Sequence, residues 1–594
     1  MLLKQAITEF QNQNYIRCLE LLANIYQTSP DLFKIKSMSL KATGQFEKSL
    51  KCLAQACSEF PSDRELNILY YQSLINANLY SQCIQAIDGN RRLIKDESIH
   101  LFLATCYIKC TLLSKAEQIL KNINKSSKYL EHWLLQEAEF LVQSARYIEA
   151  KDHLDSATTS YPNSFHLKYK YACLLKDLGD FDLAEKILTQ LPQRYEPMVE
   201  VQYVKACLLY EAGKFTEAKT SLCKIISTSP FFIPAHESFA KIEQLTDTTK
   251  YSFENFQNAI KLPNAPIELT HSYLKQLFAT EQYEEAYQVS KKALKIQSHE
   301  DIKHANSIAA YKLGLQAEAT STLHELIKHN PFNPRFAIDY ANILLRTDAT
   351  SSAAKLLEQA VHHNPFNQEL WAYLGLAWRI LGDPRHDWLN NYEDLVKVYE
   401  LPTPPGYKDS ESFFDSMNLY LSDLHNQKGA QPLDQSVKGG QQTNGHLLSI
   451  QDDLIISLRG SIEQRIKDYL KLIPDDSKHP LSQQKGKFFK LNGSWSVQLG
   501  TNGFHSNHIH PDGWISGPSY IALDENISPN DPTKSGWLKL GETSLGLDNE
   551  VVAKEICPKA GTIILFPSYM WHGTYPLTKP SKRLTVPCDI KPIF

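Results

Sequence analysis

The chain has 594 residues, of which 42% are hydrophobic and 22% charged, and its formal net charge is −4. This length exceeds what a single hydrophobic core supports, so several domains or a repeat array are expected. The charge balance has no basic surplus, which argues against a nucleic-acid partner or an anionic membrane surface.

The N-terminal segment MLLKQAITEFQNQNY lacks the apolar core of a signal peptide, and no run of about 18 apolar residues appears anywhere in the sequence. We therefore expect no membrane partner. The eleven cysteines are scattered and form no CxxC pair. They are typical of small buried residues in a reducing compartment, which predicts a cytoplasmic protein.

Short identical segments recur at a spacing of 34 residues in the first two thirds of the chain. ACLL occurs at 172–175 and 206–209, and HNPFN occurs at 329–333 and 363–367. Gly179 and Gly213 repeat at the same offset, each followed two residues later by Phe. A 34-residue period with small residues inside helices and Gly at the turn resembles the tetratricopeptide repeat.

This resemblance implies an all-α solenoid over residues 1–400, built from about twelve helical pairs and carrying a concave face. The copies are less regular between 61 and 130 and around 233–266. Repeats of this type imply a protein or peptide partner. The same stacking residues would also serve a spacer or oligomerisation scaffold, so both roles stay open.

Residues 401–445 are predicted to be a connector, because the helical period stops at the proline-rich LPTPPGYKD. The amphipathic segment SFFDSMNLYLSDLHNQ is expected to cap the last repeat. The Gly- and Gln-rich segment 431–445 is expected to be an irregular loop near the site. Apolar residues at three-to-four spacing then predict a helix over 447–473.

From residue 487 onward the pattern changes to short alternating runs such as SWSVQL, WISGPSYIAL, TIILF and RLTVPCD, separated by Gly and Pro. This pattern is typical of a β-sandwich or barrel. His508 and His510, two residues apart, would share one face of a strand. His572 follows behind a second strand-like run, and Arg583 comes eleven residues later. Two close ligands, a distant third and a trailing Arg form the layout of a non-haem iron oxygenase that uses 2-oxoglutarate.

The C-terminal motifs carry a more specific resemblance. HxHP, GWLKLG, a GTIILFPS strand leading to WHGT, and RLT together resemble the 2-oxoglutarate/Fe(II) oxygenase family in its double-stranded β-helix (jelly-roll) form. The closest likeness is to the bacterial subgroup of such oxygenases fused behind tetratricopeptide repeats. The resemblance implies a multidomain protein whose residues 446–594 form the β-helix domain with flanking helices.

The same resemblance implies a set of site residues and cofactors. Fe(II) would be bound by His508, His510 and His572, and Arg583 would pair with the distal carboxylate of 2-oxoglutarate. Thr585 and Tyr520 would add contacts to this cosubstrate, while Trp514 and Trp571 would form walls of the pocket. The implied activity is a dioxygenase that consumes O2 and hydroxylates a protein or peptide recruited by the repeats.

One position departs from the family pattern and leaves alternatives open. Most of the superfamily uses His-x-Asp/Glu with a distal His, whereas this chain has His510 at the second place. Asp512, in HPD, is the alternative ligand to His510. Two other functions also stay open: a non-catalytic repeat scaffold with a structural metal site, and a three-His dioxygenase that does not use 2-oxoglutarate.

Overall fold

The computed structural model describes residues 2–90, 96–122, 128–246, 253–426, 436–443, 447–486, 488–548, 550–579 and 581–593. They belong to two compact units. The first comprises residues 1–171 with 593–594, and the second comprises residues 172–592.

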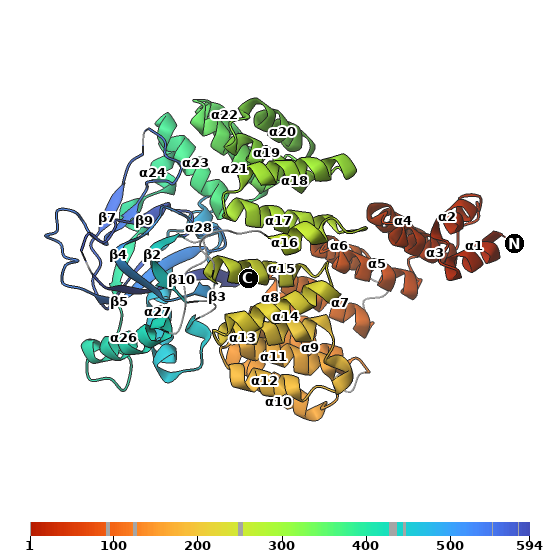
Figure 1. The fold of residues 1–594 in the computed structure, drawn as a ribbon, viewed down its shortest axis with the longest axis horizontal. Helices are drawn as coiled ribbons and strands as arrows, with labels where there is room; N and C mark the ends of the chain where they lie inside the picture. Colours follow the sequence, from red (N-terminus) through yellow and green to blue (C-terminus); the bar gives the residue numbers. More distant parts are fainter. Residues whose placement is uncertain are drawn as a thin grey trace. The chain divides into compact units, whose positions relative to one another are not determined.

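The first unit is a succession of antiparallel helical pairs, seen in red and orange in Figure 1. Neighbouring helices pack through Ala, Leu and Cys side chains that are almost fully buried, such as Ala56, Leu66 and Cys83. The helices are α1 (Leu2–Gln11), α2 (Tyr15–Ala23), α3 (Pro30–Ala42), α4 (Phe46–Glu59), α5 (Arg64–Asn76), α6 (Tyr80–Gly89), α7 (Glu97–Lys109), α8 (Leu113–Lys121), α9 (Leu130–Gln143), α10 (Tyr147–Ser160) and the first part of α11 (Phe165–Asp177).

The second unit continues the pattern of helical pairs as far as α22. Its helices are α12 (Phe181–Thr189), α13 (Val199–Glu211), α14 (Phe215–Thr228), α15 (Ile233–Thr246), α16 (Glu254–Ala259), α17 (Ile267–Ala279), α18 (Tyr283–Ile296), α19 (Glu300–Lys312), α20 (Gln316–His329), α21 (Pro334–Arg346), α22 (Thr350–His363), α23 (Gln368–Leu381), α24 (Arg385–Leu389) and α25 (Tyr392–Leu395). In the described ranges α1–α22 make eleven pairs, close to the twelve units expected.

A residue with left-handed backbone marks the turn after the first helix of most units. These residues are Gly44, Asn78, Thr111, Ala145, Gly179, Gly213, Glu281, Gly314, Asp348 and Gly382. Successive members lie 33 or 34 residues apart, apart from a double interval of 68 between Gly213 and Glu281. A left-handed residue is a common way to end a helix and reverse the chain. The 34-residue repeat is therefore confirmed, including the irregular copies between 61 and 130.

The β-domain consists of two antiparallel sheets. The larger has the order β1-β8-β5-β10-β4-β2, with β3 pairing to β10, and the smaller has the order β7-β6-β9. The strands are β1 (Lys397–Glu400), β2 (Val437–Gln442), β3 (Phe488–Ser494), β4 (Val497–His505), β5 (Ile515–Leu523), β6 (Leu538–Leu540), β7 (Lys554–Ile556), β8 (Thr562–Pro567), β9 (His572–Thr574) and β10 (Arg583–Ile593). Two antiparallel sheets with flanking helices agree with the expected jelly-roll class.

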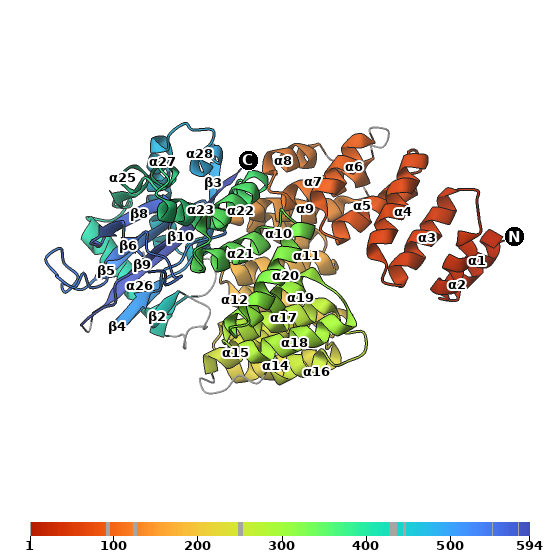
Figure 2. The same cartoon turned by 90° about the horizontal axis from the view of Figure 1, so that it is seen from above.

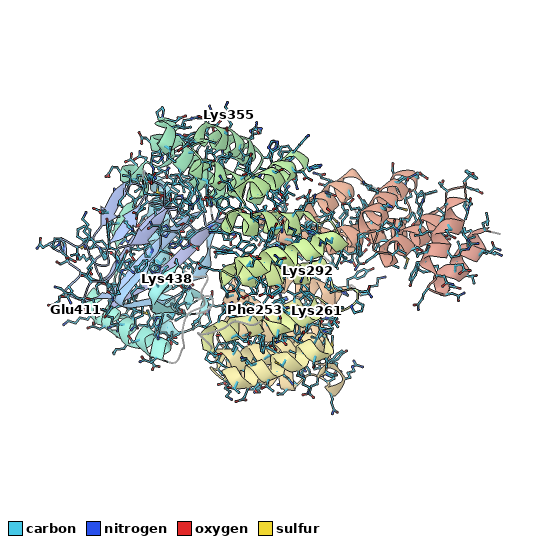
Figure 3. All side chains as sticks on the ribbon, turned by 45° about the horizontal axis from the view of Figure 1, so that its top comes forward. Phe253, Lys261, Lys292, Lys355, Glu411 and Lys438 are labelled. Atoms are coloured by element: carbon cyan, nitrogen blue, oxygen red, sulfur yellow. The ribbon has the colours of Figure 1, made fainter. Side chains whose placement is uncertain are left out.

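The Gly- and Gln-rich segment was expected to be irregular, but its residues 436–443 contain the edge strand β2, which pairs with β4. The two glycines permit close approach of the strands, since a Cβ on Gly440 would lie 2.8 Å from the carbonyl oxygen of Gln498. Lys438, labelled in Figure 3, is exposed on this edge strand, where a charge discourages pairing with other chains. The rest of the segment, 431–435 and 444–445, lies outside the described residues.

The expected capping helix forms as α26 (Ser410–Asn426), and its role as a cap of the last repeat stays a prediction. It packs against β5 of the sheet, and its buried face contributes Phe413, Met417 and Leu421 to the domain core. The second flanking helix is α27 (Asp453–Leu472), preceded by a short 3₁₀ turn (Leu447–Ser449) and capped by the Asp452 side chain. The short α28 (Pro480–Gln483) then leads to β3.

The last helices of the solenoid and the β-domain share one hydrophobic core (Figures 1 and 2). The ring centroids of Tyr373 on α23 and Trp571 lie 5.8 Å apart. Arg379, also on α23, donates to the carbonyl oxygen of Gly541 at 2.6 Å and lies 3.3 Å from the Glu550 carboxylate. β1 pairs with β8 while still on the solenoid side of residue 400. In this structure the predicted boundary at 400 therefore passes through one continuous packed body.

No helix in the described ranges combines the length and apolar character that a membrane span requires.

Candidate active site

Three histidines from different parts of the β-domain converge in one cavity between the two sheets. His508 and His510 lie in the loop after β4, and His572 begins β9. Each offers a ring nitrogen, and these three atoms all lie within 4.8 Å of one another. Among the described residues, no other group of His, Cys, Asp or Glu meets this geometry.

The histidine pair was expected to sit on a regular strand, but it lies in a loop. A local bridge replaces the strand: the amide of His508 donates to the carbonyl of His572 at 2.8 Å, and the amide of His572 donates back at 3.0 Å. Gly573 permits this close approach, because a Cβ there would lie 2.3 Å from Oδ1 of Asn507. The extended backbone still directs both rings into the cavity.

The outer ring nitrogen of each histidine has a hydrogen-bond acceptor. His508 Nδ1 lies 2.8 Å from the Ser506 carbonyl oxygen, and His572 Nδ1 lies 2.9 Å from the Met570 carbonyl oxygen. His510 Nδ1 lies 2.8 Å from the Asp589 carboxylate. Acceptors at Nδ1 fix the tautomer in which Nε2 carries the free lone pair, as in most metal-binding histidines.

Burial also favours the neutral form of the His508 and His572 rings. Desolvation, together with neighbouring His510, lowers the pKa of His508 to about 3. Desolvation, with His508 next in importance, lowers the pKa of His572 well below its ordinary value. Neutral imidazoles with oriented lone pairs suit Fe(II), and also Zn(II) and Cu(II), so the donor set fits a transition-metal ion.

Arg583 lies in the wall of the same cavity with 1% of its surface exposed. Its Nε donates to the Gly536 carbonyl at 3.2 Å, and Nη2 lies 3.5 Å from the Tyr520 hydroxyl. No carboxylate of the described residues forms an ion pair with it. A buried guanidinium without an anionic partner is costly, and burial lowers its pKa. This geometry suits an anionic ligand.

Thr585, on the same strand as Arg583, also suits an anionic ligand. It lines the cavity, and its buried hydroxyl has no hydrogen-bond partner in the described residues. The register of β10 on β5 shifts between Leu584 and Thr585, which is a β-bulge at the cavity wall. An unpartnered hydroxyl and an unpaired guanidinium on one strand form a fitting cradle for a carboxylate.

Tyr520 is fully buried beneath Arg583, whose guanidinium carbon lies 5.1 Å from the tyrosine ring centroid. It therefore supports the arginine and is not among the residues that line the cavity. Asp512 lies apart from the cluster: its side chain is 90% exposed and 3.9 Å from Lys591. The structure thus brings together the three histidines, Arg583 and Thr585, with Tyr520 behind them, and leaves Asp512 at the surface.

Neither tryptophan expected as a pocket wall lines the cavity. Trp514 is buried and donates to the Leu481 carbonyl at 3.0 Å, while Trp571 packs toward α23. The aromatic wall is Trp495, whose ring lies parallel to His510 with centroids 5.9 Å apart. Phe566, Leu538 and Pro518 complete the apolar lining.

Two polar residues of the site, His505 and Asp589, were not predicted from the sequence. His505 lines the cavity near His508, with ring centroids 6.1 Å apart. The run HSNHIH contains it, but its three-residue spacing from His508 matches no strand face. Asp589 does not line the cavity but contacts His510 from behind, and no local signal in the sequence marks it.

Comparison with known proteins supplies the family. Residues 493–589 match the model of the family described as "Putative 2OG-Fe(II) oxygenase". The C-terminal part of the chain is therefore similar to this family. The matched segment contains all three histidines, Arg583, Thr585 and Tyr520, so the motif-based resemblance of this domain is confirmed.

The wider comparisons add less. None of the curated proteins matches this chain. The crystal structure of yeast Tom70 is 12% identical and covers 72% of this chain and 95% of its own, with a TM-score of 0.34. The structure of the APC/C hetero-tetramer Cut9–Hcn1 is 11% identical and covers 64% of this chain and 89% of its own, with a TM-score of 0.26. The repeat is identified by the helical pairs of this chain, not by these likenesses.

Proposed function

We propose that this protein is an Fe(II)- and 2-oxoglutarate-dependent dioxygenase that hydroxylates a protein or peptide recruited by its repeats. One observation carries the proposal. A buried guanidinium with no carboxylate partner in the described residues shares a cavity with three histidines whose outer nitrogens are already hydrogen-bonded. A structural metal site has no need of such an anion-binding group.

In this proposal Nε2 of His508, His510 and His572 hold the metal. Arg583 binds the distal carboxylate of 2-oxoglutarate, with the Thr585 hydroxyl donating to the same group and Tyr520 holding the guanidinium in place. With these groups bound, O2 is reduced as 2-oxoglutarate loses CO2 to become succinate, and one oxygen atom is inserted into a substrate C–H bond.

The chain itself positions the reactants and excludes water. Phe566, Leu538 and Pro518 surround the histidines with apolar surface, which keeps a reactive oxidant from being quenched by solvent. The main-chain bridge between His508 and His572 ties the backbones of two of the proposed ligands together. The family's usual carboxylate ligand is absent from this set, and Asp512 is left out because of its exposure.

The role proposed for the repeats rests on the shared core. Helix α23 packs directly on the β-domain, so a polypeptide held by the last repeats would be delivered to a fixed position relative to the cavity. The experiment is co-purification of candidate peptides on the intact chain, followed by detection of a mass increase of one oxygen atom that requires 2-oxoglutarate.

The decisive test of the chemistry is an anaerobic titration of the Fe(II)-loaded protein with 2-oxoglutarate. We expect a metal-to-ligand charge-transfer band that saturates at one equivalent, and succinate once O2 is admitted. Bound iron without this band would favour a structural metal site, or a three-His dioxygenase that consumes O2 without 2-oxoglutarate.

The matched variants are His572→Ala and His362→Ala. His572→Ala should abolish stoichiometric iron binding, because two imidazoles alone hold Fe(II) weakly. His362 is exposed at the end of α22 and serves as the control, with wild-type iron content expected. Unchanged iron in His572→Ala would refute the ligand assignment.

A further inference from the structure

We propose that Asp589 is a positioning residue that supplies, through His510, the negative charge missing from the three-histidine ligand set. The inference rests on the proposed function, since it concerns the same metal site. It addresses the one position where this chain departs from the family pattern, namely His510 in place of a carboxylate.

The three histidines differ in what their outer nitrogens contact. His508 and His572 face main-chain carbonyl oxygens, whereas His510 faces a carboxylate at 2.8 Å. A carboxylate acceptor makes a stronger hydrogen bond than a carbonyl and raises the electron-donating power of the ring. The missing charge is therefore present one hydrogen bond away from the metal position.

Asp589 is held in place on its other side as well. Its Oδ1 accepts a hydrogen bond from the Ser516 hydroxyl at 2.7 Å, and Ser516 lies 2.7 Å from the Ser568 hydroxyl. These residues come from β10, β5 and the end of β8, which are neighbours in the larger sheet. Both serines are almost fully buried. This network prevents the carboxylate from turning away from His510.

The burial of Asp589 also points to a cationic neighbour. Its side chain is 12% exposed, and His510 is the one ion-pair partner recorded for it within the described residues. A buried carboxylate is costly without a compensating positive charge, and a divalent cation on the far side of the His510 ring would supply one. The surface carboxylate Asp512, two residues from His510 in sequence, has no such constraint.

The test compares Asp589→Asn with Asp512→Asn. Asparagine keeps the size of the side chain: its Oδ1 can accept from His510 Nδ1, and its Nδ2 can donate to Ser516 Oγ in place of the bond that the carboxylate accepts, so the main change is the loss of charge. Metal affinity is measured on the intact metal-free chain by anaerobic competition between the protein and a chromophoric chelator for Fe(II). We expect Asp589→Asn to weaken Fe(II) binding by about 10- to 100-fold, the range typical of such outer partners, and Asp512→Asn to match the wild type.

A second readout separates charge from simple packing. With less electron density on the metal, the charge-transfer band formed with 2-oxoglutarate should move to shorter wavelength in Asp589→Asn. Asp589→Ser provides the same loss of charge in a smaller side chain, should the asparagine variant fail to fold, as judged by thermal melting.

The outcomes of this test distinguish failure of the proposed function from failure of the role proposed for Asp589. A wild-type chain that binds no Fe(II) overturns the proposed function itself. The inference about Asp589 alone is overturned if the wild type binds Fe(II) and the Asp589 variants match it. Matching means an Fe(II) affinity within twofold of the wild type and a charge-transfer band at the same wavelength.

Discussion

The charged side chains of the solenoid and of the active site differ in whether they have a partner of opposite charge. In the solenoid they pair with one another between successive units. Glu139 lies between Lys109 and Lys170, and Arg335 contacts both Asp339 and Glu369. In the site, Arg583 is more deeply buried, yet within the described residues its hydrogen-bond partners are a carbonyl and a phenol. The solenoid thus uses charge for stability, whereas the site holds an unbalanced charge that a ligand can neutralise.

Arg583→Met should have the largest effect on 2-oxoglutarate binding. If it has no such effect, the contrast between the site and the solenoid is wrong. Loss of the guanidinium should weaken 2-oxoglutarate binding by about 100-fold or more, as expected when one member of a buried charge pair is removed. Iron content should stay at the wild-type level. The free energy of unfolding should not fall by more than about 1 kcal/mol, because a buried unpaired charge is removed together with its hydrogen bonds.

The measurements are the anaerobic titration for binding and denaturant unfolding for stability. If the variant binds 2-oxoglutarate like the wild type, the assignment of Arg583 is wrong. If it binds weakly but is also strongly destabilised, Arg583 is a structural residue and the contrast with the solenoid disappears.

Glu139→Gln should have the opposite effect: it should lower the stability of the fold and leave 2-oxoglutarate binding unchanged. Burial alone would raise the pKa of Glu139, but Lys170 and Lys109 lower it to about 2. A lowered carboxyl pKa contributes stability above the ordinary value of 4.5 that is lost as the pH falls toward 2. We expect the variant to destabilise the first unit by about 2 kcal/mol at neutral pH, and the difference to vanish near pH 2.

Amide hydrogen exchange of α7, α9 and α11 in the intact chain measures this effect, with no change expected in 2-oxoglutarate binding. Glu65→Gln is the matched control, because Glu65 pairs with Lys34 at 2.6 Å but is 78% exposed. Its effect should stay below about 0.5 kcal/mol. Equal effects for both variants would show that burial of the Glu139 cluster is irrelevant.

Thr585→Val should show the smallest effect. The substitution keeps the shape of the side chain and removes a buried hydroxyl that has no partner in the described residues. Affinity for 2-oxoglutarate should fall by about 10-fold, as for one hydrogen bond to a charged group, while the melting temperature should stay the same or rise. A falling melting temperature with unchanged affinity would assign the hydroxyl to the fold instead of the ligand.

The sequence predicted the repeat and the three histidines that converge in the structure, because both leave local signals, while the role of these histidines as metal ligands stays a prediction. Identical segments that recur every 34 residues and an HxH pair are visible without knowledge of the fold. It failed where distant segments decide the structure. β2 becomes a strand only because β4 lies alongside it.

The same limit applies within the site. Trp514 and Trp571 share the sequence neighbourhood of the histidines, yet their rings point into the core, and Trp495 takes the place expected for them. Which side of an irregular segment faces a cavity depends on tertiary contacts that no local pattern records. The domain boundaries at 400 and 445, the cytoplasmic location and the likeness to a bacterial subgroup remain predictions.

The two main-chain hydrogen bonds between His508 and His572 have a consequence for the loss and rebinding of the proposed metal ion. The main chains of the two residues are joined by hydrogen bonds that do not involve the ring nitrogens proposed to bind the metal. In small zinc domains the ion drives folding, and chelation unfolds them. Here a chelator should remove the ion and leave the domain folded, so that metal can be lost and reloaded many times within the lifetime of one chain.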